Sequence, residues 1–352
     1  MLIVVEMPSP LRLRLDAPAL IANWRWLAAR SGTAACGAAV KADGYGLGAT
    51  GVTKRLANAG CRDFFVATWA EALALGTMPP GTTLSVLHGV RREDMETARA
   101  SSAKPVLNSI AQVDRWRTTG RSCDVMVDTG MNRLGISVAD VAAGLLDGLT
   151  IDTLMSHLAS ADEDTAQNGV QRAVFAALAG KTAAKRMSLA NSAGICLGAD
   201  FAFDLTRPGL ALYGGIPRAE AQGHIAQVAH VEAQVLQRRR IGAGDSVGYN
   251  ATYTAARDTE LAILNIGYAD GYLRGFSGGR AGLGGSAGGG RFPVIGRVSM
   301  DLIAVGVDAE PGVGEGDWIE IDYALPAASR ASGLSQYELL TGLGQRFDRV
   351  WA

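Results

Sequence analysis

The chain has 352 residues, a formal net charge of -1, 48% hydrophobic residues and 19% charged residues. This length is enough for two domains, and the composition is typical of a folded protein rather than a disordered one. The nearly neutral charge argues against a nucleic-acid partner or an anionic membrane surface. No apolar run approaches the roughly 18 residues that span a bilayer. We therefore expect a cytoplasmic protein that binds neither nucleic acid nor membrane.

The cysteines and histidines do not indicate a metal site. Four cysteines are scattered without a CxxC spacing, and four histidines form neither HxxxH nor HExxH. Closely spaced ligands of this kind are the usual sign of a structural or catalytic metal. We expect no bound metal and interpret the cysteines as small buried apolar side chains.

Short β-type runs alternate with helical stretches over the first two thirds of the chain. Strands that alternate with helices predict parallel pairing, and eight such units in roughly 200 residues favour a closed (β/α)8 barrel over an open sheet. One interval, 51–60, ends on a glycine suited to a helix C-cap, and another is expected to open at Asp164 and close on Gly180. The eight runs span 36–42, 64–69, 84–89, 104–109, 123–129, 152–158, 186–192 and 203–215.

After about residue 225 the pattern changes to strands separated by Gly-Asp turns. Runs such as HVEAQVLQRRRI and DWIEI predict a second, mainly-β domain. The glycine-rich segment 277–291 is expected to be a flexible loop. The predicted fold is therefore α/β: a (β/α)8 TIM-type barrel over 10–225, followed by a mainly-β domain over 226–352 with which residues 1–9 could pack.

Lys41 is the most informative single residue. It stands at the end of the first predicted strand, in GAAVKADGYGLG, and the carboxyl ends of barrel strands face the active site. A desolvated lysine loses its proton more easily and becomes a nucleophile, whereas arginine stays charged. Polar residues at other strand ends could converge on an anionic cofactor, but spacing alone leaves open a lysine that reaches solvent. These residues are Arg133, His157, Ser192 and Arg207.

The same stretch resembles the pyridoxal-phosphate lysine motif of the alanine racemase family, AVVKANAYGHG. Seven further segments resemble that family in its order and spacing, so the resemblance covers the chain from about residue 10 to its end. It implies a barrel followed by a β domain and a racemase that interconverts L- and D-alanine, supplying D-alanine for cell-wall peptidoglycan. The further segments are VDTGMNRLGI, SHLASAD, LANSAGI, RPGLALYGG, VGYNATYTA, IGYADGY and GRVSMD.

The resemblance implies two catalytic residues and one cofactor. Lys41 would hold pyridoxal 5'-phosphate covalently and move the substrate α-proton on one face, while Tyr249 would do so on the opposite face. Two bases are needed because reprotonation must come from the side that the proton did not leave. The family is a homodimer in which Tyr249, Met300 and Asp301 reach the neighbouring subunit's site.

The resemblance also implies the binding residues. Tyr45, Ser192 and the backbone at Gly209 and Leu210 would contact the phosphate, and Arg207 would face the pyridine nitrogen with support from His157. A guanidinium only donates, so that nitrogen would stay unprotonated. Arg133 would bind the substrate carboxylate, and the residues around the substrate entrance would be Tyr268, Met300 and Asp301.

One departure from the family pattern concerns Met126. Many members have a lysine there, whose carbamate orients the arginine that corresponds to Arg133. Methionine cannot do this, so we expect another side chain or a bound anion such as chloride to orient Arg133. Substrate range also stays open, because a racemase for serine or other small amino acids would share these motifs. A non-catalytic carrier of the cofactor on the same barrel is a further alternative, although such proteins lack the β domain.

Overall fold

The computed structural model describes residues 8–282, 284–287 and 290–352, and divides the chain into two compact units. One unit is Pro18–Ala226, and the other combines the residues up to Ala17 with Gln227–Ala352. We call them the barrel unit and the β unit. Within the described residues, no helix is both long and apolar enough to cross a bilayer.

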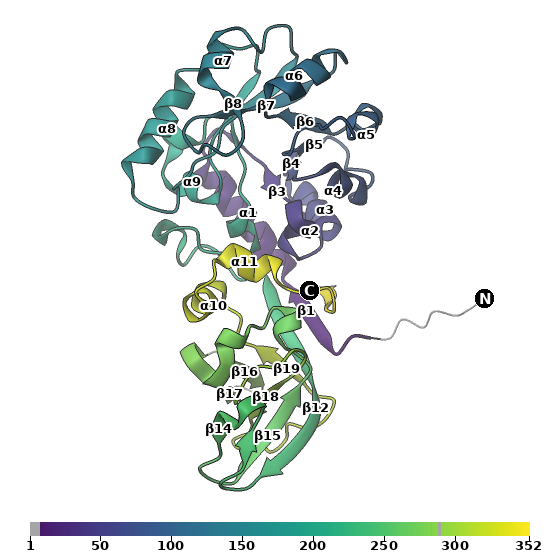
Figure 1. Ribbon diagram of the computed structural model, residues 1–352, viewed down its shortest axis with the longest axis vertical. Helices are drawn as coiled ribbons and strands as arrows, with labels where there is room; N and C mark the ends of the chain where they lie inside the picture. Colours follow the sequence, from purple (N-terminus) through teal and green to yellow (C-terminus); the bar gives the residue numbers. More distant parts are fainter. Residues whose placement is uncertain (1–7, 283, 288–289) are drawn as a thin grey trace, which may run out of the picture. The chain divides into compact units, whose positions relative to one another are not determined.

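The barrel unit contains all eight predicted parallel strands, each shorter than its predicted run. Parallel pairs connect β3 through β7, β9 and β10 in the order β3-β4-β5-β6-β7-β9-β10, and the helices lie outside these strands (Figure 1). The strands are β2 (Ala35–Cys36), β3 (Ala38–Ala39), β4 (Asp63–Val66), β5 (Thr83–Val86), β6 (Lys104–Leu107), β7 (Cys123–Asp128), β9 (Ile151–Met155), β10 (Arg186–Ser188) and β11 (Leu205–Thr206), with β8 (Ile136–Ser137) paired to β7.

Backbone hydrogen bonds across β11 close the ring. Strand β11 pairs with β2, and the chain crosses to β3 at Gly37, whose N–H donates to the Thr206 carbonyl at 2.9 Å. On the other side of β11, the Asp204 N–H donates to the Met187 carbonyl at 3.0 Å. A Cβ at Gly37 would lie 2.7 Å from the Asp63 carbonyl oxygen, so glycine is required where the first strand changes partner. The predicted closed barrel is confirmed.

The helices of the barrel unit begin and end largely where capping residues place them. Gly60 closes α3 with a φ of 118°, as predicted. Helix α8 begins after Thr165 rather than at Asp164 and ends before Gly180, because Thr165 accepts the Gln167 N–H and caps it. The helices are α1 (Ala17–Arg30), α2 (Lys41–Tyr45), α3 (Ala49–Ala59), α4 (Trp69–Ala74), α5 (Met95–Ala100), α6 (Ile110–Arg117), α7 (Val138–Ala142), α8 (Ala166–Ala176) and α9 (Ser192–Cys196), with 3-10 turns η1 (Ala199–Phe201), η2 (Leu210–Tyr213) and η3 (Ala219–Ala221).

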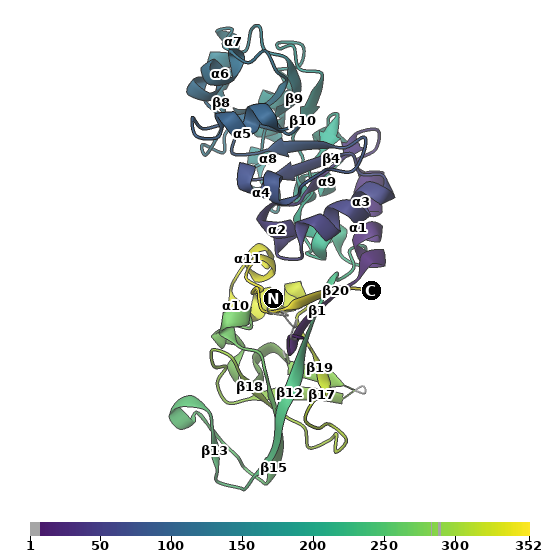
Figure 2. The same ribbon diagram turned by 90° about the vertical axis from the view of Figure 1, so that its right-hand side faces the viewer.

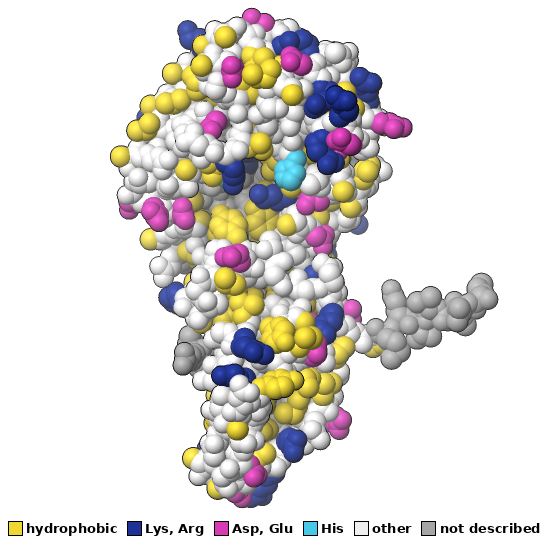
Figure 3. All heavy atoms as spheres, in the orientation of Figure 1, with side chains coloured by type: hydrophobic (Ala, Val, Ile, Leu, Met, Phe, Trp, Pro, Cys, Tyr) yellow, Lys and Arg dark blue, Asp and Glu magenta, His cyan; other side chains and the backbone are white. Residues whose placement is uncertain are grey.

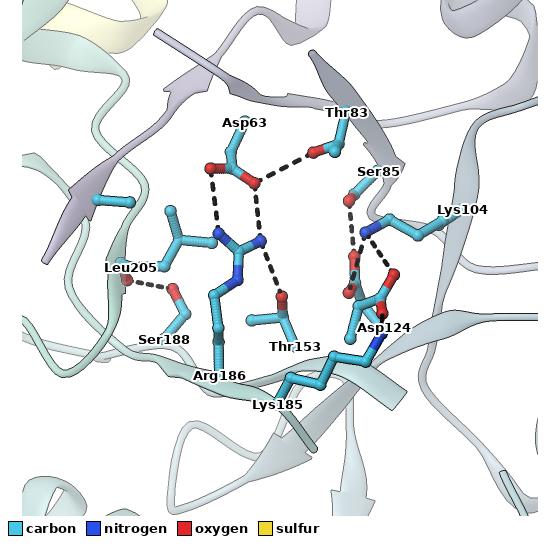
Figure 4. A network of polar contacts seen from close by, with 12 residues as sticks. Asp63, Thr83, Ser85, Lys104, Asp124, Thr153, Lys185, Arg186, Ser188 and Leu205 are labelled. Carbon is cyan, nitrogen blue, oxygen red and sulfur yellow. Dashed lines mark hydrogen bonds and ion pairs between the residues drawn. The ribbon is translucent and has the colours of Figure 1, made fainter. Parts of the chain in front are cut away.

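An ionic network lies at the amino-terminal ends of the barrel strands (Figure 4). The Arg186 guanidinium donates to both Asp63 oxygens, at 2.7 and 3.2 Å, and Lys104 Nζ lies 3.0 Å from Asp152 and 3.8 Å from Asp124. Each of these residues is the first or second of its strand. Burial raises the pKa of Asp124, and the nearby Lys104 ammonium opposes that rise.

The β unit is built on a mostly antiparallel sheet around the long strand β12, which Figure 2 shows running along the unit. Strand β1 pairs with β12 and with β20, so it belongs to this unit, whereas the predicted boundary placed it with the barrel. The elements are β1 (Leu11–Leu15), β12 (Ala229–Ile241), β13 (Ser246–Val247), β14 (Tyr253–Thr254), β15 (Thr259–Leu264), β16 (Gly284–Ala287), β17 (Gly290–Ile295), β18 (Ile303–Gly306), β19 (Trp318–Ile321), β20 (Asp348–Trp351), η4 (Tyr249–Ala251), η5 (Tyr268–Asp270), η6 (Arg274–Gly282), α10 (Leu325–Ser332) and α11 (Gln336–Thr341).

The predicted flexible loop over 277–291 is wrong for its described residues. They form the end of η6 and a hairpin in which β16 pairs with β17, and β16 also pairs with β19. The backbone hydrogen bonds of the sheet compensate for the low strand propensity of glycine. Residues 283 and 288–289 lie outside the described residues, as do residues 1–7 of the predicted packing segment. Ser9 does bond this unit, through its N–H to an Asp348 oxygen at 2.9 Å.

Candidate active site

Lys41 lies two residues after the end of β3 and begins a short left-handed turn. All residues of 42–46 have positive φ, between 51° and 86°. Such a conformation costs an L-residue about 1–2 kcal/mol, and Ala42, Asp43 and Tyr45 all adopt it. Backbone hydrogen bonds compensate in part, since the Gly44 N–H donates to the Val40 carbonyl at 2.9 Å. The predicted strand through residue 42 therefore ends earlier, and the lysine stands on a turn of fixed geometry.

Glu71 anchors this turn to the start of α4. Its Oε1 accepts the Ala42 N–H at 2.9 Å, and its Oε2 accepts the Ala67 N–H at 2.6 Å. It also completes a capping box with Thr68. Sequence reasoning missed Glu71, although the T-x-x-E pattern of a capping box was visible.

The surroundings of Lys41 lower the pKa of its ammonium. Burial is the largest cause and the Arg133 charge comes next. The Glu71 carboxylate opposes them, and the more weakly acting Arg207 charge lowers the pKa further. A lower pKa increases the fraction of neutral amine at physiological pH, and the neutral amine is the nucleophile.

Arg207 is a buried cation held by neutral groups. Its guanidinium donates to the Ser188 hydroxyl and to the Ser156 carbonyl at 2.6 Å, and among the described residues no carboxylate pairs with it. Burial lowers the pKa of Arg207 to about 10, so it remains charged at neutral pH. Sequence reasoning missed both contacts, because β-type runs do not reveal which hydroxyl points inward or which backbone carbonyl accepts a side-chain hydrogen bond.

His157 lies just beyond β9 and is half-buried. Burial first, then the charges of Arg207, Arg133 and Lys41, lower the pKa of His157 to about 3. The imidazole is therefore neutral at pH 7. Because the charges of Arg207, Arg133 and Lys41 all act on His157, these four predicted residues lie near one another at the carboxyl ends of the strands. Figure 3 shows Lys and Arg side chains around a hollow in the barrel unit.

Tyr45, Ser192 and Gly209 form a cradle beside these cations. The Ser192 hydroxyl oxygen accepts the N–H groups of Gly209 at 3.0 Å and Ala211 at 3.2 Å, which leaves its O–H free to donate. A Cβ at Gly209 would lie 2.1 Å from the Tyr45 hydroxyl oxygen, so only glycine admits that hydroxyl. Leu210 follows as the first residue of η2. Hydroxyl groups beside cations that form no ion pair with a described residue fit an anionic ligand such as a phosphate ester.

The loop that carries Arg133 is ordered by Asp128. Its Oδ1 accepts the N–H groups of Gly130 and Met131 at 2.9 Å and of Asn132 at 3.1 Å. Met126 is buried in β7, opposite Met155 of β9. Within the described part of the chain, no side chain or carbonyl forms a hydrogen bond or ion pair with the exposed Arg133 guanidinium.

The remaining predicted site residues belong to the β unit and are exposed there. Tyr249 is 63% exposed, Met300 53% and Tyr268 37%, and Asp301 is also exposed. Tyr249 lines a groove of about 570 Å³ together with residues such as Val247, Arg297 and Leu302.

Comparison with known proteins identifies the family. The models "Alanine racemase, N-terminal domain" and "Alanine racemase, C-terminal domain" match residues 15–217 and 228–351. An alanine racemase of Acidiphilium cryptum is 42% identical over 96% of this chain and 98% of its own, and a biosynthetic alanine racemase of Agrobacterium fabrum is 39% identical over 97% and 94%. The crystal structure of alanine racemase from Bartonella henselae with covalently bound pyridoxal phosphate aligns with a TM-score of 0.88 at 36% identity, covering 98% of this chain and 100% of that one. This chain belongs to the alanine racemase family.

Proposed function

We propose that the chain is an alanine racemase that interconverts L- and D-alanine with pyridoxal phosphate bound covalently at Lys41. The observation that carries this proposal is the lysine of lowered pKa on a fixed turn, beside unpaired cations and a hydroxyl-lined cradle. The family and the covalent cofactor of the Bartonella henselae structure support it. We propose that the cell uses the D-alanine to build cell-wall peptidoglycan.

The residues present fit the cofactor. When bound, pyridoxal phosphate stabilises negative charge at the substrate α-carbon. The hydroxyls of Tyr45 and Ser192 and the backbone at Gly209 and Leu210 would bind its phosphate. Arg207 would donate to the pyridine nitrogen, and neutral His157 would avoid adding a second buried charge beside it.

Lys41 and Tyr249 would share the proton transfer. The Lys41 amine, neutral in part because of its surroundings, accepts or returns the α-proton on one face of the substrate. The Tyr249 hydroxyl does the same on the opposite face, and Arg133 holds the carboxylate between them. Inversion requires both groups, because one base alone returns the proton to the face from which it came.

Substitution of Tyr249 by phenylalanine tests this division of roles. We expect racemisation to fall by two to four orders of magnitude, about the contribution of a general acid or base. One enantiomer should still exchange its α-hydrogen with deuterated solvent through Lys41. Equal residual exchange from both enantiomers would contradict the two-base proposal.

We also propose a homodimer with shared sites. Tyr249 and Leu302 are exposed apolar side chains that line the groove of the β unit, and Met300, next in the chain to the lining residue Ser299, is exposed as well. Clustered exposure of this kind is typical of an interface. The partner in the proposed dimer is a second copy of the chain, whose Lys41 would face Tyr249.

Mixing two inactive variants tests the dimer. Lys41→Ala and Tyr249→Phe chains, dissociated and reassociated together, should form hybrids with one intact site. Random pairing predicts recovery of about a quarter of the wild-type activity. No recovery from a mixture shown to contain hybrids would mean that each chain completes its own site.

A further inference from the structure

The β unit contains a charged clamp centred on Arg346, a residue that lies outside the motifs of the sequence analysis. The Arg346 guanidinium donates through Nε and Nη2 to both oxygens of Asp270, at 2.7 and 2.8 Å, and through Nη1 to Asp301 at 2.7 Å. Asp270 is fully buried, whereas Asp301 is exposed. A single guanidinium therefore joins a buried carboxylate to an exposed one.

The clamp holds three segments that are distant in the sequence. The Gly267 N–H donates to the second oxygen of Asp270 at 3.0 Å, which fixes the turn η5 that carries Tyr268. The Tyr268 N–H donates to the Ser299 carbonyl at 3.0 Å. A Cβ at Gly267 would lie 2.3 Å from the Met300 carbonyl oxygen, so the two segments are in close contact.

Further contacts join the third segment. The Ala269 N–H donates to the Met300 carbonyl at 3.0 Å, and the Gly344 N–H donates to the Asp270 carbonyl at 3.4 Å. The Tyr268 ring also packs under the Arg274 guanidinium, 5.3 Å from the ring centroid. Residues 267–270, 299–301 and 344–346 thus form one cluster, with Arg346 as its ionic link.

We infer that Arg346 is a positioning residue for the substrate entrance: by joining Asp270 to Asp301 it sets where Tyr268, Met300 and Asp301 stand. This inference rests on the proposed function, because those three residues are its expected entrance. The guanidinium also reduces the negative charge that Asp301 presents to the carboxylate of an incoming amino acid. Lysine cannot replace it, because one ammonium lacks the planar fork that serves three oxygens at once.

Arg346→Lys is the informative variant. Its ammonium stays with buried Asp270, so the chain keeps the compensated charge it needs to fold, while Asp301 loses its partner. We expect the KM for alanine to rise roughly five-fold with kcat within a factor of about two, the pattern of lost substrate binding rather than lost chemistry. The matched control is Arg238→Lys, in the same unit. Arg238 also forks, from Glu260 to the carbonyls of the 310–313 segment, away from the entrance residues.

A double-mutant cycle separates positioning from stability. If Arg346 acts on KM through Asp301, Arg346→Lys should add little to KM in an Asp301→Asn background, yet still lower Tm there through Asp270. An unchanged KM in Arg346→Lys, or the same rise in KM in both backgrounds, would overturn the inference.

Hydrogen exchange on the cofactor-free chain gives a readout that does not depend on activity. Amides in 267–272 and 299–302 should exchange faster in Arg346→Lys and at the wild-type rate in Arg238→Lys. Unchanged exchange in Arg346→Lys would overturn the clamp whatever the enzyme does. Failure of the proposed function would instead appear in the wild-type chain itself, as an absence of racemisation.

Discussion

The two ends of the barrel differ in whether the cations there are paired with carboxylates. At the amino-terminal ends of the strands, the cations Arg186 and Lys104 face carboxylates (Figure 4). At the carboxyl ends, Lys41, Arg133 and Arg207 form no ion pair with any described residue, and the histidine among them is neutral. Balanced charge suits an end that only has to hold strands together, whereas unbalanced positive charge suits an end that binds an anionic cofactor and a carboxylate.

Breaking the balanced end should have the largest effect on stability. Arg186→Met leaves the Asp63 carboxylate, which is nearly buried, without its bidentate partner. We expect a loss of about 3–5 kcal/mol in the free energy of unfolding, because an uncompensated buried charge is costly. Urea denaturation measures it. Lys185→Met is the control: that ammonium is exposed in its pair with Asp152, so its loss should cost about 1 kcal/mol or less. Equal losses in the two variants would contradict the comparison.

The pH dependence of stability tests the other end of the barrel, where cations that form no ion pair with a described residue surround His157. The folded-state pKa of about 3 lies below the ordinary value of 6.5. Between these two pH values, His157 is protonated in the unfolded chain and neutral in the folded chain. The contribution of neutral His157 to the free energy of unfolding is therefore complete above about pH 6.5 and is lost as the pH falls toward 3. Between about pH 5.5 and about pH 4.5 the wild type should lose about 1.4 kcal/mol more per pH unit than His157→Gln. Parallel curves for the two proteins would show that His157 protonates normally.

We expect the smallest effect from removing the anion that would orient Arg133. With Met126 in place of a carbamylated lysine, an anion such as chloride would occupy the space beside the guanidinium. Exhaustive exchange of chloride for a large, weakly coordinating anion should raise the KM for alanine severalfold, on the order of 1 kcal/mol. Added bicarbonate should not change the activity. Kinetics unaffected by chloride removal would mean that the protein alone holds Arg133.

Much of the barrel could be predicted from the sequence, because short β-type runs at regular intervals specify strands and their order. The left-handed turn after Lys41 could not, since the intrinsic preferences of Ala42, Asp43 and Tyr45 oppose it and only the surrounding contacts impose it. The hairpin that begins within 277–291 was missed for a similar reason. Glycine has a low strand propensity, and only pairing with the neighbouring strands of the sheet defines β16.

The charged residues show the same limit at longer range. Lys104, Asp124 and Arg186 stand at the starts of predicted strands, so a paired network there could have been expected. The link from Arg346 to Asp270 spans 76 residues of sequence, and no local pattern reports such a contact. The residues that resemble the family motifs could be named in advance, but the contacts by which Glu71, Ser156 and Ser188 support them required the fold.

The most direct test of the account is the site of covalent cofactor attachment. The purified chain, loaded with pyridoxal phosphate and reduced with borohydride, should carry the pyridoxyl group on Lys41, because burial and the adjacent arginines lower the pKa of that amine. Peptide mapping locates the modified residue. The chain has four other lysines, Lys54, Lys104, Lys181 and Lys185. Label on any of these in place of Lys41 would contradict the account.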